Sequence, residues 1–173
     1  MRYLTKTLDF DSRGDSVVTL GKFDGLHRGH MLLIRRVLAI GRTERLETVV
    51  FTFDVPPQSK VQHVKPHQLL TNEERRDRLE QLGMDCLVEC PFVDEVMHMT
   101  PEAFIKEILV DKLHAKKVVV GKDFGFGYKR SGTAEMLKEM GPSLGFETEI
   151  IEKAEENGRE ISSTWAREEL EQG

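Results

Sequence analysis

The sequence has few cysteines, no long apolar run and no excess of positive charge, and each shortage excludes a class of protein. Two cysteines among 173 residues are too few for the disulfide framework of a small secreted domain. No apolar run approaches the roughly 20 residues that span a bilayer, and residues 1–16 lack the apolar core of a secretion signal. The net charge of −5 argues against general binding to nucleic acid or to acidic membranes.

What is present is the composition of a globular domain, with 39% hydrophobic and 32% charged residues. This length suits one domain with a substantial core, so we expect a single domain over residues 1–173 of a cytoplasmic protein. Nothing in the pattern assigns an oligomeric state. Cys86 and Cys90 flank an apolar stretch that predicts a buried strand with both thiols on one face, rather than a redox or metal site.

Short apolar runs alternate with helical patterns along the chain. Strands are predicted at residues 17–20, 48–53, 86–90, 117–121 and 146–151. Helices are predicted from Gly29 to about Gly41, from Thr71 to about Leu82, from Thr100, over 133–140 and over 164–171, and a turn at 157–158. This alternation predicts a doubly wound α/β domain with a parallel sheet and right-handed crossovers. In such folds ligands bind beyond the carboxyl ends of the strands.

The loop after the first predicted strand, residues 21–30 (G-K-F-D-G-L-H-R-G-H), has the composition of a phosphate site. Its glycines permit close approach of a ligand, and the helix that follows presents free amides and a positive dipole end. His27 and His30 are three residues apart, so both face the same way on a first helical turn, where they suit the charge on a phosphate under attack. The alternatives are a tight crossover, or a metal site using Asp24, His27 and His30.

This loop resembles the G-x-F-D-G-x-H-x-G-H motif of the HxGH nucleotidylyltransferases, and among them the prokaryotic FAD synthetases. The latter are adenylyltransferase modules of bifunctional riboflavin kinase/FMN adenylyltransferases. The resemblance extends from about Ser16 to Gly173 and implies a Rossmann-like nucleotidylyltransferase fold. It also implies that the family's C-terminal riboflavin kinase domain is absent from this chain. Within the loop it implies ATP binding by a set of five residues: Gly21, Lys22, Phe23, Asp24 and Gly29.

Residues 161–167 (I-S-S-T-W-A-R) resemble the family's second motif, I-S-S-T-x-I-R. Hydroxyl groups at a helix start are good caps and good phosphate ligands, and an arginine one turn later can reach a polyphosphate. The resemblance therefore implies that Ser163 and Thr164 bind ATP and that Arg167 belongs to the catalytic set with His27 and His30. A capped terminal helix with a surface arginine is the plainer alternative.

Two further loops resemble the family's flavin-binding segments. Residues 121–127 (G-K-D-F-G-F-G) are similar to G-x-D-F-R-F-G, and residues 52–57 (T-F-D-V-P-P) occupy the place of T-F-x-P-H-P. Glycine-flanked aromatic residues after a strand would form a flat wall for a ring system, or would simply pack beneath the loop. The implied flavin-binding residues are Phe53, Pro57, Asp123, Phe124 and Phe126.

The sequence departs from these patterns at several positions. Val55 and Pro56 replace the proline and histidine of P-H-P, and Gly125 replaces the arginine of D-F-R-F-G. These changes leave fewer polar groups for the flavin or its phosphate. Lys129 and Arg130, just after the loop, could steer an anionic substrate or lie as exposed charges on a turn.

The resemblance implies that the chain transfers AMP from ATP to FMN, giving FAD and pyrophosphate, with Mg²⁺ entering together with ATP and no protein-bound metal. The FMN phosphate is already mostly ionised at pH 7, so alignment and charge stabilisation can carry the reaction without a general base. The alternatives are the same chemistry on another phosphorylated acceptor, or a non-catalytic nucleotide or flavin sensor. A third is a hydrolytic metalloenzyme built on Asp24, His27 and His30.

Overall fold

The computed structural model describes residues 1–21, 23, 28–53, 72–152, 155–156 and 159–160. In this part of the chain, six parallel strands form one sheet in the order β1-β4-β3-β2-β5-β8. The strands of the sheet, in chain order, are β1 (Arg2–Thr5), β2 (Ser16–Leu20), β3 (Glu47–Phe53), β4 (Cys86–Cys90), β5 (Ala115–Gly121) and β8 (Glu147–Ile151).

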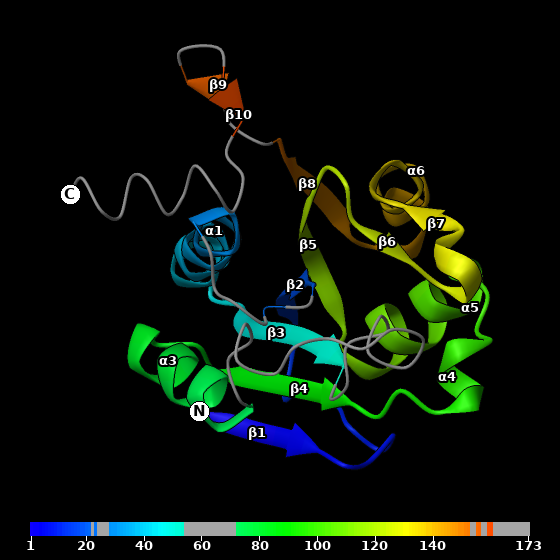
Figure 1. Ribbon diagram of the computed structural model, residues 1–173, viewed down its shortest axis with the longest axis horizontal. Coiled ribbons are helices and arrows are strands. Elements are labelled where there is room, and N and C mark those ends of the chain that lie inside the picture. The colour runs from blue at the N-terminus through cyan, green and yellow to red at the C-terminus, as the bar shows by residue number, and fades with distance from the viewer. Residues whose placement is uncertain (22, 24–27, 54–71, 153–154, 157–158, 161–173) are drawn as a thin grey trace.

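Helices cover both faces of the sheet, as a parallel sheet requires (Figure 1). One face packs on α1 (Arg28–Glu44) and α3 (Asn72–Leu82). The other face packs on α4 (Asp94–Met97), on α5 (Pro101–Ala103) with its π-helical continuation η2 (Phe104–Lys112), and on α6 (Ala134–Leu144). The doubly wound α/β architecture predicted from the sequence is confirmed.

The strand order reverses at the centre of the sheet. From β2 the chain moves outward through β3 to β4 on one side, then crosses to β5 and continues to β8 on the other. The carboxyl ends of β2 and β5 therefore leave a crevice between loops that diverge in opposite directions, which is where ligands bind in such folds. Topology thus places the loop after β2 beside the loop after β5.

Local signals explain where several elements begin and end. Thr100 caps α5, because its hydroxyl oxygen accepts a hydrogen bond of 3.1 Å from the Ala103 amide, and Pro101 occupies the first helical position. Thr133 caps α6 in the same manner, and α3 ends at Gly83 with φ of +96°. The predicted Thr71 cap, the turn at 157–158 and the helix over 164–171 lie outside the described residues.

The prediction that α1 ends near Gly41 is wrong, because the helix continues to Glu44. A Cβ at Gly41 would collide with the Thr48 side chain at the start of β3. Gly41 is therefore required by close packing between helix and strand.

Strand β1 was not predicted: it pairs with β4 at the sheet edge, and a four-residue edge strand with mixed side chains carries little periodic signal. The short hairpins β6 (Gly125–Phe126) with β7 (Gly132–Thr133), and β9 (Glu155–Glu156) with β10 (Arg159–Glu160), were also not predicted.

A buried ion pair joins α3 to β4. The Arg75 guanidinium lies 2.5 Å from the Glu89 carboxylate, and both side chains are almost completely buried. The Tyr3 hydroxyl donates a hydrogen bond to the same carboxylate, and the Arg76 guanidinium lies 3.5 Å from the centre of the Tyr3 ring. The carboxylate therefore ties the edge strand β1 and helix α3 to β4.

Replacing Glu89 by alanine should lower the free energy of unfolding by about 3–5 kcal/mol, because the buried Arg75 guanidinium and the Tyr3 hydroxyl would both lose the carboxylate that they contact. Urea denaturation measures this loss. Glu80→Ala, on the exposed face of the same helix, is the matched control and should change stability by less than about 0.5 kcal/mol. Equal stability of the two variants would show that the pair contributes nothing.

The two cysteines lie buried on one face of β4, as predicted, and both are free thiols. Burial raises the pKa of Cys86 to about 12, so the thiolate, which is the reactive form, is rare at neutral pH. We expect Ellman's reagent at pH 8 to label neither thiol in the folded protein and both in denaturant. Rapid labelling of the folded chain would contradict the burial.

The same pKa predicts how stability depends on pH. The folded state holds the Cys86 proton more tightly than the unfolded state does, so protonation of Cys86 stabilises the fold. This contribution is complete below the pKa of an unfolded thiol. It declines as pH rises toward about 12. Alkaline denaturation of Cys86→Ala, compared with the unchanged chain, measures the contribution: the variant should lose less stability between pH 9 and 11.

Candidate functional site

The candidate site is at the carboxyl edge of the sheet, where the neighbouring strands β3, β2 and β5 end. Strand β2 ends at Leu20, and the Gly21 amide donates a 3.3 Å hydrogen bond to the Phe51 carbonyl of β3. Strand β5 ends at Gly121, next to β2 in the sheet. Gly21 and Gly121 therefore begin two of the four sequence-predicted binding segments, and they do so on neighbouring strands.

Phe23 holds the loop after β2 against the core. Its side chain is completely buried, and its backbone has φ of +53°, a left-handed conformation that is unusual for a bulky residue. A Cβ at Gly21 would lie only 3.1 Å from the Phe23 ring, which explains the need for glycine there. Such a strained residue persists only where its surroundings fix it, and here the ring is fixed by the core beneath the loop.

His30 sits on the first turn of α1, directly above Phe23. The two rings are 5.2 Å apart and tilted by 51°, and the imidazole is half-buried. No acidic residue occupies the first turn of α1, so no carboxylate within that turn offsets the positive end of the helix dipole. Gly29 has open space where a side chain would be. Of the first motif, the structure therefore describes Gly21, Phe23, Gly29 and His30.

The remaining predicted site residues lie outside the described residues: His27, Lys22, Asp24, Pro57, Ser163, Thr164 and Arg167. The metal alternative with Asp24, His27 and His30 falls largely on the same residues. Within the described part of the chain, no three His, Cys, Asp or Glu side chains gather as metal ligands. The same part contains no helix whose length and hydrophobicity would let it cross a membrane.

Aromatic rings form a continuous path through the core that links the segment after β4 to the loop after β5. Each ring centre lies between 4.8 and 5.7 Å from the next. The path consists, in order, of Phe92, Phe53, Phe51, Phe104, Phe126 and Phe124. Because the interior rings are packed on both sides, the path sets the positions of its end members.

The three predicted flavin-contacting phenylalanines differ in exposure. Phe126 is 4% exposed and lies in the core, whereas Phe53 and Phe124 are half-buried and lie at the margin of the same core cluster. Phe124 is stacked on Phe126 with an interplanar angle of 14°. The structure therefore places Phe126 as the support and leaves surface on Phe53 and Phe124. Phe92, which contacts Phe53, was missed from the sequence because no glycine marks its loop.

Asp123 lies in a tight turn after β5. The Phe124 amide donates a 3.1 Å hydrogen bond to the Gly121 carbonyl, and the Lys122 amide donates one of 3.2 Å to the Ile151 carbonyl of β8. Arg130 approaches the same turn, because its Nη2 lies 3.4 Å from the Asp123 carbonyl oxygen. The loop after β5 is thus fixed by the backbone of the neighbouring strand and by one guanidinium.

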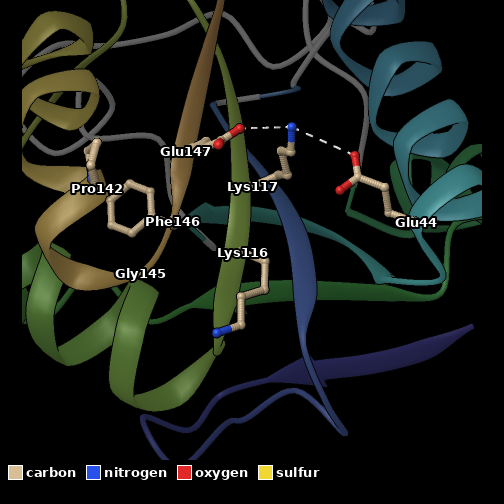
Figure 2. Close-up of a pocket in the computed structure, with 7 residues that line it drawn as sticks. All are labelled: Glu44, Lys116, Lys117, Pro142, Gly145, Phe146 and Glu147. Atoms are coloured by element: carbon tan, nitrogen blue, oxygen red, sulfur yellow. Dashed lines mark ion pairs between the residues drawn. The ribbon is translucent and has the colours of Figure 1, made fainter.

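A separate open pocket lies at the other edge of the sheet, where the amino ends of β5 and β8 are found. Figure 2 shows the Lys117 ammonium between Glu147 at 3.1 Å and Glu44 at 3.7 Å. The hydrogen bond to Glu147 is the main cause of the raised pKa of Lys117. Helices α1 and α6 both end here, so their negative dipole ends disfavour a phosphate. This pocket is therefore not part of the candidate site.

A sheet whose strand order reverses between β2 and β5, with glycine-led loops at that edge, defines a Rossmann-like α/β protein of the nucleotidyltransferase type. The FAD synthetase family model matches residues 9–165, and the chain belongs to this family. It is 33% identical over 157 residues to the bifunctional riboflavin kinase/FMN adenylyltransferase of Buchnera aphidicola subsp. Acyrthosiphon pisum, covering 90% of this chain and 50% of that protein. The corresponding Escherichia coli K12 protein is 34% identical over 155 residues, covering 89% and 50%.

Two solved structures are similar to the chain. The crystal structure of a protein named "Macrolide-efflux Protein" from Streptococcus pneumoniae has a TM-score of 0.75 and 32% identity, covering 92% of this chain and 52% of that one. Pantoate-beta-alanine ligase from Francisella tularensis has a TM-score of 0.50 and 12% identity, covering 86% and 63%, and shows likeness of fold alone. The chain spans about half the length of the two curated relatives described above.

Substituting the two stacked phenylalanines should separate binding from stability. For the flavin site that the sequence resemblance implies, Phe124→Ala should weaken FMN binding by about three- to tenfold, the loss of one stacking contact, with little change in unfolding free energy. Phe126→Ala should lower that free energy by about 3–5 kcal/mol, because it opens a cavity in the core. Flavin fluorescence titration and urea denaturation measure the two effects. The reverse pattern would mean that Phe124 is the supporting ring.

Proposed function

We propose that this chain transfers the AMP group of ATP to the phosphate of FMN, forming FAD and releasing pyrophosphate. The observation that carries the proposal is the juxtaposition, on neighbouring strands, of the helix-start loop bearing His30 and the loop bearing Phe124. Membership of the FAD synthetase family supports the choice of ATP and FMN. Residues 1–173 would act as one nucleotidylyltransferase domain, since two core clusters cover the two faces of a single sheet.

The chemistry requires one bond to form and one to break at the α-phosphorus of ATP. An oxygen of the FMN phosphate attacks that phosphorus, and the bond to the bridging oxygen toward the β-phosphate breaks, so that pyrophosphate leaves. No proton needs to be removed from the nucleophile, because its second pKa lies near 6. Catalysis then depends on holding the two phosphates in line and on stabilising charge around the reacting phosphorus.

His30 would supply part of that stabilisation. The Phe23 ring beneath it restricts the position of the imidazole, and the amides at the start of α1 add positive potential. His27, Lys22 and Asp24 would complete the first loop around ATP. Ser163, Thr164 and Arg167 of the second motif would hold the departing β- and γ-phosphates. Mg²⁺ would arrive bound to ATP as part of the substrate, since it retains most of its water ligands.

The flavin would lie against the half-buried surfaces of Phe124 and Phe53, with Asp123 and Pro57 nearby and Phe126 as the support beneath. Nucleic acid and membranes have no place in this reaction. We place the reaction in the cytoplasm, and the two free thiols fit a reducing compartment.

Two other functions remain distinguishable by experiment. Another phosphorylated acceptor would give AMP transfer that FMN does not support, and a sensor would bind ATP and FMN without releasing pyrophosphate. Chromatographic measurement of FAD and pyrophosphate from the purified chain with ATP, FMN and Mg²⁺ decides among them. Equal amounts of FAD and pyrophosphate are expected.

His30→Ala should reduce turnover by roughly 10²- to 10³-fold, the usual effect of losing one group that stabilises the transition state. ATP affinity should change by no more than a few-fold, because the contact strengthens only as charge develops. FAD formation under saturating substrates and equilibrium ATP binding measure the two quantities. The thermal midpoint serves as the folding control. Equal losses in turnover and affinity would remove His30 from this role.

A further inference from the structure

The turn that follows the acceptor loop has an unusual backbone. Three of the four residues from Gly127 to Arg130 have positive φ: Gly127 (+77°), Lys129 (+53°) and Arg130 (+55°). Left-handed backbone is unfavourable for residues that carry a Cβ, and two such residues in succession require external support. The turn therefore depends on neighbouring segments to hold it in this conformation.

The turn is held by the segment before α5. The Tyr128 amide donates a 2.9 Å hydrogen bond to the Met99 carbonyl, and the Arg130 amide donates one of 3.0 Å to the Gly127 carbonyl. A Cβ at Gly127 would lie 2.9 Å from the Pro101 ring, so the turn fits closely against the start of the helix. The backbone path of the turn, and with it the direction of each Cα–Cβ bond, is consequently restricted.

This geometry sends the two neighbouring cations to different places. The Lys129 ammonium lies 5.4 Å from the centre of the Tyr128 ring. Arg130 folds back across β6. Its Nε and Nη2 lie 2.7 and 3.1 Å from the point where a Cβ at Gly125 would be. The Arg130 guanidinium thus occupies the space that any side chain at Gly125 would need.

The guanidinium in this position retains most of its binding capacity. It has five N–H donors, and its hydrogen bond to the Asp123 carbonyl oxygen is long, at 3.4 Å. The side chain is exposed, and no carboxylate among the described residues pairs with it. An arginine held at the margin of an aromatic loop with free donors is suited to bind an anion with planar, bidentate geometry.

We propose that Arg130 binds the phosphate of the flavin acceptor and thereby favours FMN over unphosphorylated riboflavin, an inference that rests on the proposed function. The acceptor loop carries the half-buried ring of Phe124 six residues before Arg130, whose guanidinium returns to the same loop. The FMN phosphate, with a charge between −1.5 and −2 at pH 7, is the part of the acceptor that a guanidinium recognises. The ATP phosphates belong instead to the start of α1.

Flavin fluorescence titration of the full chain tests the proposal. Arg130→Gln should weaken FMN binding by roughly ten- to hundredfold, as expected for the loss of a charged hydrogen-bonded contact. Binding of riboflavin and of ATP should change by less than about twofold. Lys129→Gln, the matched control, removes a charge of the same sign one residue away and should leave FMN and riboflavin binding unchanged. Equal weakening of FMN and riboflavin, or no effect on either, would overturn the proposal.

A double-mutant cycle tests the geometry. Gly125→Ala places a Cβ where the guanidinium lies, so by itself it should weaken FMN binding nearly as much as Arg130→Ala does. In the Arg130→Ala background the guanidinium is absent from this space, so adding Gly125→Ala should weaken FMN binding little further. Simple additivity of the two losses would show that Arg130 does not act from this position.

Failure of this inference can be told apart from failure of the proposed function. If the unchanged chain forms FAD and Arg130→Gln keeps the same KM for FMN, only the role of Arg130 is wrong. If the unchanged chain binds no FMN, both fail. The thermal midpoint of each variant verifies that it is folded. Arg130→Lys, which retains charge but loses the planar fork, should fall between the unchanged chain and Arg130→Gln.

Discussion

The structure depends on one constraint: a parallel sheet must be covered on both faces. Strand β2, at the centre, has all five residues buried, so helices are needed on each side. A chain that supplies them in the order seen here must reverse its direction of winding once. That reversal, between β2 and β5, creates the crevice in which the loops bearing His30 and Phe124 are neighbours. The candidate site is thus a consequence of burying the sheet.

The core also reaches into the site through aromatic packing. Phe23 is buried beneath His30 on the α1 face, while Phe126 is buried beneath Phe124 on the opposite face. In each case a fully or almost fully buried ring supports a partly exposed group. Because protein interiors are closely packed, these supports restrict the exposed groups more than a loop alone could. Such restriction would suit the proposed AMP transfer, which needs the two reacting phosphates to be held in line.

The structure changes the interpretation of one departure from the family patterns, the glycine at position 125. Gly125 looks from the sequence like the loss of a cation from the acceptor loop. In the structure, the Arg130 guanidinium occupies the space beside Gly125, although Arg130 lies five residues later, in a strained turn. The positive charge near a loop therefore depends on which side chains lie against the loop in the folded chain. A linear motif does not contain this information.

The sequence by itself determined the doubly wound fold, the helix start at Thr100 and the burial of both cysteines, because period, helix-start signals and apolar runs are local properties. It also identified the candidate loops around His30 and Phe124. Only the tertiary structure decided that α1 continues through Gly41, that β1 joins the sheet beside Glu89, that Phe126 is support rather than surface, and that Arg130 lies against Gly125. Each of these depends on contacts between residues distant along the chain or on a turn's exact path, and side-chain pattern alone encodes neither.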